Sequence, residues 1–527
     1  MGDKYDRQLR LWGAEGQRLL AKTHVLVIGS CATASEALKN LVLPGVGQFL
    51  ILDDANVSLA DVTNNFFVAA DTVGHSRSKT VANLLLEMNT DVKGESRHAN
   101  VEQVLQDEPQ FLDQFDLVLA TQLDEIVTVK LAQLCLSKQI PLILVTSYGF
   151  LGSLRLQVVR HVITDAKLDP PRHDLRLSKP FPELEKFASS VDLDSLSTIE
   201  HAHVPFVVLL LQAMRKWKET HHGSFPITFA EKEAFKKNLQ AMAWGPHGHE
   251  VNFLEAAENA YMAYMPSKVS DEVLWVLKAA PSHTISIQSL DKSRDIKEFW
   301  LLAHALADFI EQNDNLLPIT GVLPDMTAMT DVYVALQEIY MNKAKEDAQK
   351  VHLILRKRLQ NLQLADDSIS IEKVMTFCKR APSIGMLETR SVMQEYELVD
   401  LSSVDLQEED KEQSPLIWYF MLRAVSAFAS EFHRCPGSED STAVQDGTWL
   451  VSKAKQLATG SAVTDWITDN HVLEMTRSSE VELHNIAALM GGMAAQEAIK
   501  IITHQFEPLN HTYIFNGISG AAATYQL

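Results

Sequence analysis

The turn after the first apolar run is the feature that most constrains this chain. Residues 24–29, His-Val-Leu-Val-Ile-Gly, form a short apolar run that ends in glycine, which is typical of a buried parallel strand. Residues 34–42 then have helical apolar spacing, and a second apolar run at residues 49–54 ends in two carboxylates. Strand, helix and strand at this spacing predict a βαβ unit, and therefore an α/β fold with a doubly wound sheet.

The same turn lacks the glycines of a phosphate-binding loop. Such a loop needs glycines because backbone N–H groups must reach the phosphate at the helix N-terminus. Residues 29–34 read Gly-Ser-Cys-Ala-Thr-Ala, so only Gly29 remains, and the later side chains would crowd a phosphate. An acidic residue that could contact a ribose follows as Asp53 or Asp54, although a solvated strand end explains either residue equally well. We expect the fold without a competent nucleotide site; a working variant loop is the alternative.

Further along the chain the apolar spacing changes. Strand patterns recur at 115–121 and 140–146, whereas most of 183–480 has helical spacing; its clearest helix spans 331–362, with Thr330 as a possible cap. The spacing therefore predicts an α/β domain at 1–182, a mostly helical insertion at 183–480 and a returning segment at 481–527.

The returning segment predicts a helix at 486–503 and a strand at 512–515. Because a lone helix and strand make no core of their own, we expect them to rejoin the first domain. Gly491 and Gly492 lie within that helix, where small residues permit close approach of another backbone.

Composition excludes several classes of function. The chain has 527 residues, is 46% apolar and carries a net charge of −21, so it is globular and acidic. That charge argues against binding nucleic acid or an anionic membrane surface. No run approaches the ~20 apolar residues of a membrane span, so we expect no nucleic acid and no membrane among its partners.

Four widely spaced cysteines make neither a zinc site nor a disulfide framework. They favour a reducing compartment, cytoplasmic or nuclear. The histidine pairs of the chain lack a third ligand nearby, so we interpret them as solvated loop residues and expect no metal site; they are His201 with His203, His221 with His222, and His247 with His249.

Several motifs carry a resemblance to a known family. Residues 5–13, Tyr-Asp-Arg-Gln-Leu-Arg-Leu-Trp-Gly, and residues 38–47, Leu-Lys-Asn-Leu-Val-Leu-Pro-Gly-Val-Gly, resemble the ubiquitin-like-modifier activating enzymes, whose adenylation domain has the Rossmann-like ThiF/MoeB fold. Residues 64–67, 174–184, 317–326 and 494–503 resemble a regulatory, non-catalytic subunit of that family. The similarity covers essentially the whole chain.

The resemblance implies a heterodimer. A catalytic partner subunit would bind ATP and Mg²⁺, adenylate the C-terminus of a ubiquitin-like modifier and form the thioester. The helical insertion of this chain would be equivalent to the catalytic-cysteine domain and wall the cleft over the modifier. The resemblance further implies that Arg7 reaches the partner's ATP in trans; the alternative is that Arg7 only decorates a surface helix.

The chain departs from the active members at its own nucleotide site. Where they carry an Arg for the phosphates, an Asp for nucleotide and magnesium, and a Lys, this sequence has Asn64, Leu123 and Arg77. We expect a degenerate site that binds no cofactor, made of Gly29, Asp53, Asp54, Asn64, Arg77 and Leu123.

The thioester site is degenerate as well, because neither Cys378 nor Cys435 is followed by the Thr usual after the catalytic cysteine. The chain alone is therefore expected to be non-catalytic. Other hypotheses are a self-sufficient homodimeric adenylating enzyme, a nicotinamide- or flavin-dependent oxidoreductase, and a pure protein adaptor.

Overall fold

The computed structural model describes residues 4–170, 173–244, 250–285, 294–365, 368–406, 411–479 and 481–527. The chain forms two compact units, one of Met1–Ile163 with Leu387–Leu527 and one of Thr164–Met386. The predicted boundaries at 182 and 480 are therefore wrong, because the helices between 387 and 480 belong to the α/β unit. Helical spacing shows that a segment has an apolar face, but not which unit covers it.

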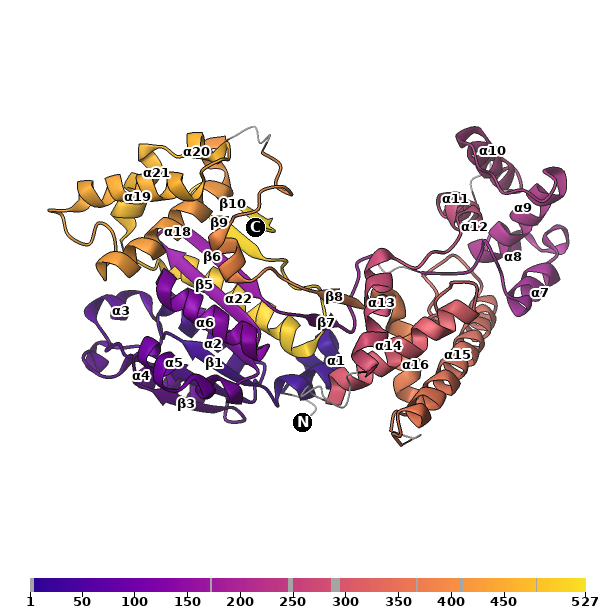
Figure 1. Ribbon diagram of the computed structural model, residues 1–527. Coiled ribbons are helices and arrows are strands. Elements are labelled where there is room, and N and C mark those ends of the chain that lie inside the picture. Colours follow the sequence, from indigo (N-terminus) through magenta and orange to yellow (C-terminus); the bar gives the residue numbers. More distant parts are fainter. Residues whose placement is uncertain are drawn as a thin grey trace. The chain divides into compact units, whose positions relative to one another are not determined.

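The α/β unit is built on a sheet in the strand order β10-β9-β6-β5-β4-β1-β2-β3 within the described residues (Figure 1). Five strands run parallel to one another, and three more extend the sheet in antiparallel fashion beyond β5. The parallel strands are β1 (His24–Ile28), β2 (Gln48–Leu52), β3 (Lys93–Arg97), β4 (Leu117–Thr121) and β5 (Leu142–Tyr148); the antiparallel ones are β6 (Leu151–Gln157), β9 (Thr512–Asn516) and β10 (Ala521–Tyr525).

The predicted doubly wound fold is confirmed, and so is the return of the C-terminal segment, because β9 pairs directly with β6. The strands expected at 24–29, 49–54, 115–121, 140–146 and 512–515 are present. Apolar patterning missed β3, whose sequence Lys-Gly-Glu-Ser-Arg is polar because it forms the edge of the sheet.

Alternate residues of the central strands enter two different cores. Val25 and Val27 pack with the first set of helices, whereas Leu26 and Ile28 pack with the second. The first set comprises α1 (Asp6–Leu20), α2 (Ala32–Val42), α4 (Arg77–Met88) and α22 (His484–Thr503); the second comprises α5 (Val101–Asp107), α6 (Glu125–Lys138) and α17 (Val392–Glu397). Helices therefore cover both faces of the sheet.

Helix α22 lies against α2 at very short range. A Cβ on Gly491 would stand 2.7 Å from Glu36 Cβ and 2.8 Å from the backbone N of Ala37, whereas at Gly492 the nearest atom would be 3.9 Å away. The expected close approach is confirmed at Gly491. By length and composition α22 could also cross a membrane, contrary to the expectation that no segment would qualify, but 61% of its apolar window is buried as a core helix.

A further cluster of helices packs on β9 and β10 at one end of the sheet. It buries Trp418 and Phe420 against Ile514. Its helices are α18 (Pro415–Phe432), α19 (Ala443–Leu457), α20 (Val463–Trp466) and α21 (Asp469–Ser478), while the short α3 (Leu59–Asn64) follows β2.

The second unit is mostly helical, as expected. Its long helix α15 begins at Thr330 with Met329 as its N-cap, so the expected capping role of Thr330 is wrong. His201 is buried rather than solvated, with Nδ1 3.0 Å from Glu250 Oε2, while His247 and His249 lie outside the described residues. The helices are α7 (Pro182–Ser190), α8 (Thr198–His201), α9 (Phe206–Thr220), α10 (Phe229–Gln240), α11 (Val251–Glu258), α12 (Tyr261–Tyr264), α13 (Asp271–Ile285), α14 (Arg294–Gln312), α15 (Thr330–Asn361) and α16 (Ile371–Arg380); the short strands β7 (His161–Ile163) and β8 (Gly385–Leu387) adjoin the unit boundaries.

Candidate functional site

The candidate site lies where the strand order reverses, between β1 and β4. Doubly wound sheets bind ligands in the crevice outside the carboxyl ends of these strands. Gly29, directly after β1, has φ +91°, and a Cβ there would lie 2.5 Å from Thr121 Oγ1 at the end of β4. Gly29 is therefore required by the turn and by the approach of two strands, whether or not a ligand binds.

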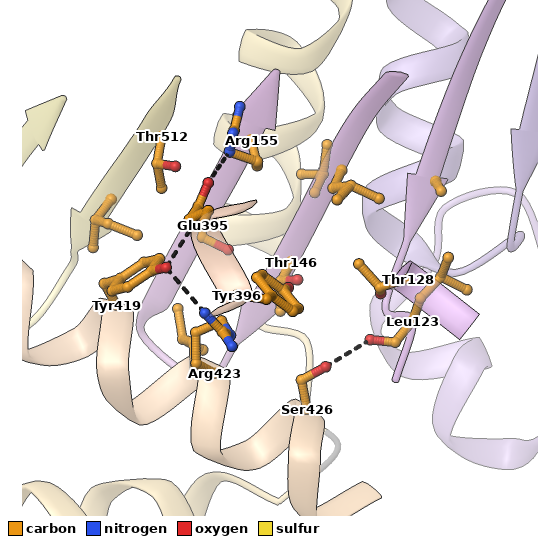
Figure 2. Close-up of a pocket in the computed structure, with 16 residues that line it drawn as sticks. Leu123, Thr128, Thr146, Arg155, Glu395, Tyr396, Tyr419, Arg423, Ser426 and Thr512 are labelled. Carbon is orange, nitrogen blue, oxygen red and sulfur yellow. Dashed lines mark hydrogen bonds and ion pairs between the residues drawn. The ribbon is translucent and has the colours of Figure 1, made fainter. Parts of the chain in front are cut away.

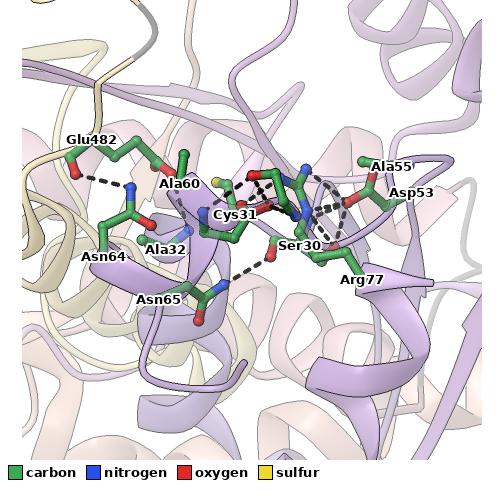
Figure 3. Close-up of polar contacts among 12 residues, drawn as sticks. Ser30, Cys31, Ala32, Asp53, Ala55, Ala60, Asn64, Asn65, Arg77 and Glu482 are labelled. Carbon is green, nitrogen blue, oxygen red and sulfur yellow. Dashed lines mark hydrogen bonds and ion pairs between the residues drawn. The ribbon is translucent and has the colours of Figure 1, made fainter. Parts of the chain in front are cut away.

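A carboxylate of the chain itself occupies the N-terminus of α2 (Figure 3). Glu482 Oε2 accepts the Ala32 N–H at 3.0 Å, and Oε1 accepts the Thr33 N–H at 3.2 Å and the Thr33 hydroxyl at 2.6 Å. Thr33 also shares a hydrogen bond with Ser147 at the end of β5. Glu482 is 7% exposed, so its negative charge is held against the positive end of the helix with little access to water.

Asn64 fastens the segment that carries Glu482. Its Nδ2 donates to the backbone O of Glu482 at 3.2 Å, and the Asn64 backbone O lies 2.9 Å from His484 Nδ1. On the other side, the Gly149 N–H donates to the Val481 O at 2.8 Å. Asn64 therefore lies in the predicted site and binds the returning chain there.

Arg77 is the cation of the site, and two carboxylates hold it. Its Nη2 lies 3.0 Å from Asp53 Oδ2 (Figure 3). Its Nη1 lies 2.9 Å from Asp61 Oδ1. Burial disfavours the charged guanidinium, but Asp53 and Asp61 outweigh it and raise the pKa of Arg77. Burial likewise opposes the charged form of Asp61, but hydrogen bonds from Ser58 and the charge of Arg77 lower its pKa.

Asp53 is held by hydrogen bonds within the chain. It is buried, and it accepts hydrogen bonds from the N–H and hydroxyl of Ser30 as well as from Arg77. The N–H of Ala55 also donates to it at 3.0 Å. A solvated strand end is therefore the wrong interpretation of Asp53. Its neighbour Asp54 is exposed and accepts from Asn100 Nδ2 at 2.9 Å.

Leu123 follows β4 and lines a separate polar cavity of about 70 Å³ (Figure 2). Across this cavity Arg155 pairs with Glu395, Tyr419 donates to Glu395 Oε1 at 2.8 Å, and Arg423 Nη1 donates to the Tyr419 hydroxyl at 3.1 Å. The charged groups of the cavity thus bind one another. The structure brings Gly29, Asp53, Asn64 and Arg77 together, whereas Asp54 and Leu123 point elsewhere.

Arg7 is exposed on α1, and within the described part of the chain no hydrogen bond or ion pair engages it. Its neighbour Arg10 is bound by Asp6, with Nη2 2.9 Å from Oδ2. Gly13, at φ +71° and ψ 177°, interrupts the helix after this turn. The Arg7 guanidinium is therefore available to another molecule.

Three of the four cysteines are buried, which disfavours their reactive thiolate forms. Burial raises the pKa of Cys378 in α16 and of Cys135 in α6 to about 12, and it raises the pKa of Cys31 as well. The four cysteines, all within the described residues, form no disulfide, and Cys435 is half-buried. In the described residues, no group of three or more His, Cys, Asp or Glu side chains could hold a metal ion.

Sequence reasoning identified Asp53, Asn64 and Arg77 but missed Asp61 as a partner of Arg77 and missed Glu482 entirely. The order Ser58-Leu59-Ala60-Asp61 carries a capping-box pattern that could have located Asp61 at a helix start. Glu482 carries no such signal, because it becomes part of the site only when the C-terminal segment returns.

Comparison with known proteins identifies the class. The ThiF family model matches residues 5–526, so the chain belongs to the ThiF family. It is similar to NEDD8-activating enzyme E1 regulatory subunits from Danio rerio, 35% identical over 99% of this chain and 98% of that protein, and from Xenopus laevis, 36% identical with the same coverage. It is also 35% identical to the Arabidopsis thaliana regulatory subunit AXR1, over 98% of this chain and 94% of that protein. Within the ThiF family, the chain belongs with these regulatory subunits.

Proposed function

We propose that this chain is the non-catalytic subunit of a heterodimeric enzyme that activates the ubiquitin-like modifier NEDD8. Nearly full-length relatives carry that role in their names. The observation that carries the proposal is that Asp53 and Asp61 both form ion pairs with the Arg77 guanidinium. A cation already neutralised by two carboxylates has little charge left for a triphosphate.

The residues of this chain do not fit ATP at its own site. A triphosphate would meet three carboxylates, Glu482 at the start of α2 and Asp53 and Asp61, which already engage Arg77. Like charges at this range repel strongly where water is scarce. We therefore propose that ATP and Mg²⁺ bind in the partner subunit, which adenylates the modifier C-terminus and takes it onto its own cysteine.

Arg7 is the residue by which this chain would take part in the chemistry. An exposed guanidinium that has no hydrogen-bond or ion-pair partner among the described residues offers a planar fork of donors to phosphate oxygens. Supplied in trans, it would stabilise charge that develops on the phosphates during adenylation. Four cysteines that form no disulfide suit a reducing compartment, so we propose that this work takes place in the cytoplasm and nucleus.

The test is modifier-dependent ATP–pyrophosphate exchange, measured on this chain alone, on the candidate catalytic subunit alone and on the two together. We expect no exchange by this chain and robust exchange by the pair. Exchange by this chain alone would overturn the proposal in favour of a self-sufficient homodimeric enzyme. Equal exchange by the catalytic subunit with and without this chain would also overturn it and favour an adaptor role.

A further inference from the structure

We propose that Glu482 is the resident anion of the degenerate site. Its carboxylate occupies the position of a nucleotide phosphate at the N-terminus of α2, and this occupation, beyond the loss of glycines, closes the site to phosphate ligands. The inference rests on the proposed function, in which this chain binds no nucleotide. It adds that the site is filled from within the chain.

The N-terminus of α2 lies at the ligand-binding edge of the sheet. Helix α2 follows β1 at the point where the strand order reverses, and in a βαβ unit this is the helix end that holds phosphate. Its first N–H groups have no partner inside the helix and need an external acceptor. Glu482 reaches them from 450 residues further along the chain.

Hydrogen-bond donors at the start of α2 are already bound to Glu482. Glu482 accepts hydrogen bonds from the N–H groups of Ala32 and Thr33 and from the hydroxyl of Thr33. A carboxylate with two oxygens against consecutive helix N–H groups makes the same contacts as two oxygens of a phosphate. The first turn of α2 therefore has these donors already in use (Figure 3).

Backbone contacts of its segment hold the Glu482 carboxylate in place. The backbone of its segment is held by Asn64 on one side and by Gly149 on the other, and the side chain is 7% exposed. A carboxylate held by backbone contacts on both sides remains beside the helix. A phosphate could enter only if Glu482 left, and it would then also face the Arg77 cluster, whose charges are already paired.

The proposal predicts that inorganic phosphate can replace the missing carboxylate. In the full-length Glu482→Ala variant we expect a lowered Tm that rises with millimolar phosphate at constant ionic strength, with half-saturation at a defined concentration. The wild-type chain should show no such saturable rise. Phosphate also stabilises proteins generally by exclusion from their surface, so the comparison between variants is the readout.

Glu231→Ala is the matched control. Glu231 is the third residue of α10, and its carboxylate accepts the Thr228 N–H in an exposed capping box, so its loss removes a cap without opening a buried helix end. This variant should show no saturable phosphate effect. If Glu482→Ala responds to phosphate no more than the wild type and Glu231→Ala do, the inference is wrong.

Binding of Mg-ATP by the isolated wild-type chain, measured by equilibrium dialysis, separates the two claims. If the wild-type chain binds Mg-ATP, the proposed function itself is wrong. If the wild-type chain does not bind Mg-ATP and phosphate does not raise the Tm of Glu482→Ala, only the role of Glu482 is wrong. If Glu482→Ala does not fold, Glu482→Gln provides the test by amide hydrogen exchange. We expect severalfold faster exchange in a peptide covering the start of α2, because a neutral amide is the weaker acceptor. Unchanged exchange would contradict the proposal.

Discussion

Arg77 donates to a single oxygen of Asp53, Oδ2, from both Nε and Nη2, at 3.1 and 3.0 Å. The remaining nitrogen, Nη1, reaches Asp61 at 2.9 Å, so all of the guanidinium nitrogens serve intramolecular bonds. Arg77 is thereby a structural cation, and its contribution to the free energy of unfolding can be measured.

Arg77→Ala should lower the free energy of unfolding by about 3 kcal/mol, because it leaves the largely buried Asp53 and Asp61 without a counter-charge. Urea unfolding of the full chain measures this. Arg97→Ala is the matched control, since Arg97 makes a similar paired contact with the more exposed Glu108 and should cost less than about 1 kcal/mol. Equal losses in the two variants would contradict the structural role of Arg77.

Arg7→Ala should slow modifier adenylation by the assembled pair on the order of 10²-fold, the scale seen when one donor to transition-state charge is removed. The two subunits should still assemble, because Arg7 is exposed and makes no internal contact in the described chain. Pyrophosphate exchange and size-exclusion chromatography measure the two effects. Arg10→Ala is the control, with Arg10 bound to Asp6. If the pair that contains Arg7→Ala exchanges pyrophosphate as fast as the wild-type pair does, Arg7 does not act in trans.

Gly491→Ala and Gly492→Ala should have opposite effects, although the residues are adjacent. The new Cβ at 491 would collide with backbone and Cβ atoms of α2, which predicts a loss of about 1–3 kcal/mol. The new Cβ at 492 meets nothing closer than 3.9 Å, so the helix should gain up to about 1 kcal/mol. Thermal unfolding compares the two; a loss at both positions would contradict the packing described for α22.

His511 should make stability fall as the solution becomes acidic. Its Nε2 accepts the Arg390 N–H at 3.1 Å, and burial, together with Arg155 and Arg390 and against Glu395, lowers its pKa to about 4. The unfolded chain binds a proton near pH 6.5 while the folded chain does not, so stability is lost between pH 6.5 and about 4.

Between pH 7 and pH 5 this one group contributes a loss of about 2 kcal/mol. In His511→Gln, which retains an acceptor but does not titrate, that part of the pH dependence should disappear. Urea midpoints at the two pH values test it, with the same substitution at the exposed His98 as control. If His511→Gln retains the full pH dependence of the wild type, the assignment to His511 is wrong.

The sequence predicted those parts of the fold whose signal is local. Apolar runs marked β1, β2, β4 and β5, since buried parallel strands are apolar on both faces. It did not predict that α18 packs on the sheet, because that helix is apolar enough to suit either unit. The burial of Asp53 was not predictable either, because it depends on pairing with an arginine 24 residues later in the chain.

The candidate site shows the same limit. Residues 29–34 directly show that the glycines are missing, and this absence predicts a phosphate-binding loop that no longer functions. The group that took the place of the ligand lies at Glu482, and no spacing rule connects residues so far apart. A sequence can therefore reveal that a binding loop is lost more readily than what has filled it.

The pairing of β6 with β9 also bears on how the protein is made. During synthesis β6 (Leu151–Gln157) leaves the ribosome long before its neighbour β9 (Thr512–Asn516), and the whole second unit emerges in between. Until then β6 is an open sheet edge and the face of α2 that meets Gly491 is bare. A nascent chain that still lacks α22 and β9 thus exposes surfaces of the kind that chaperones bind, and the sheet of this unit is completed only after the second unit has been synthesised.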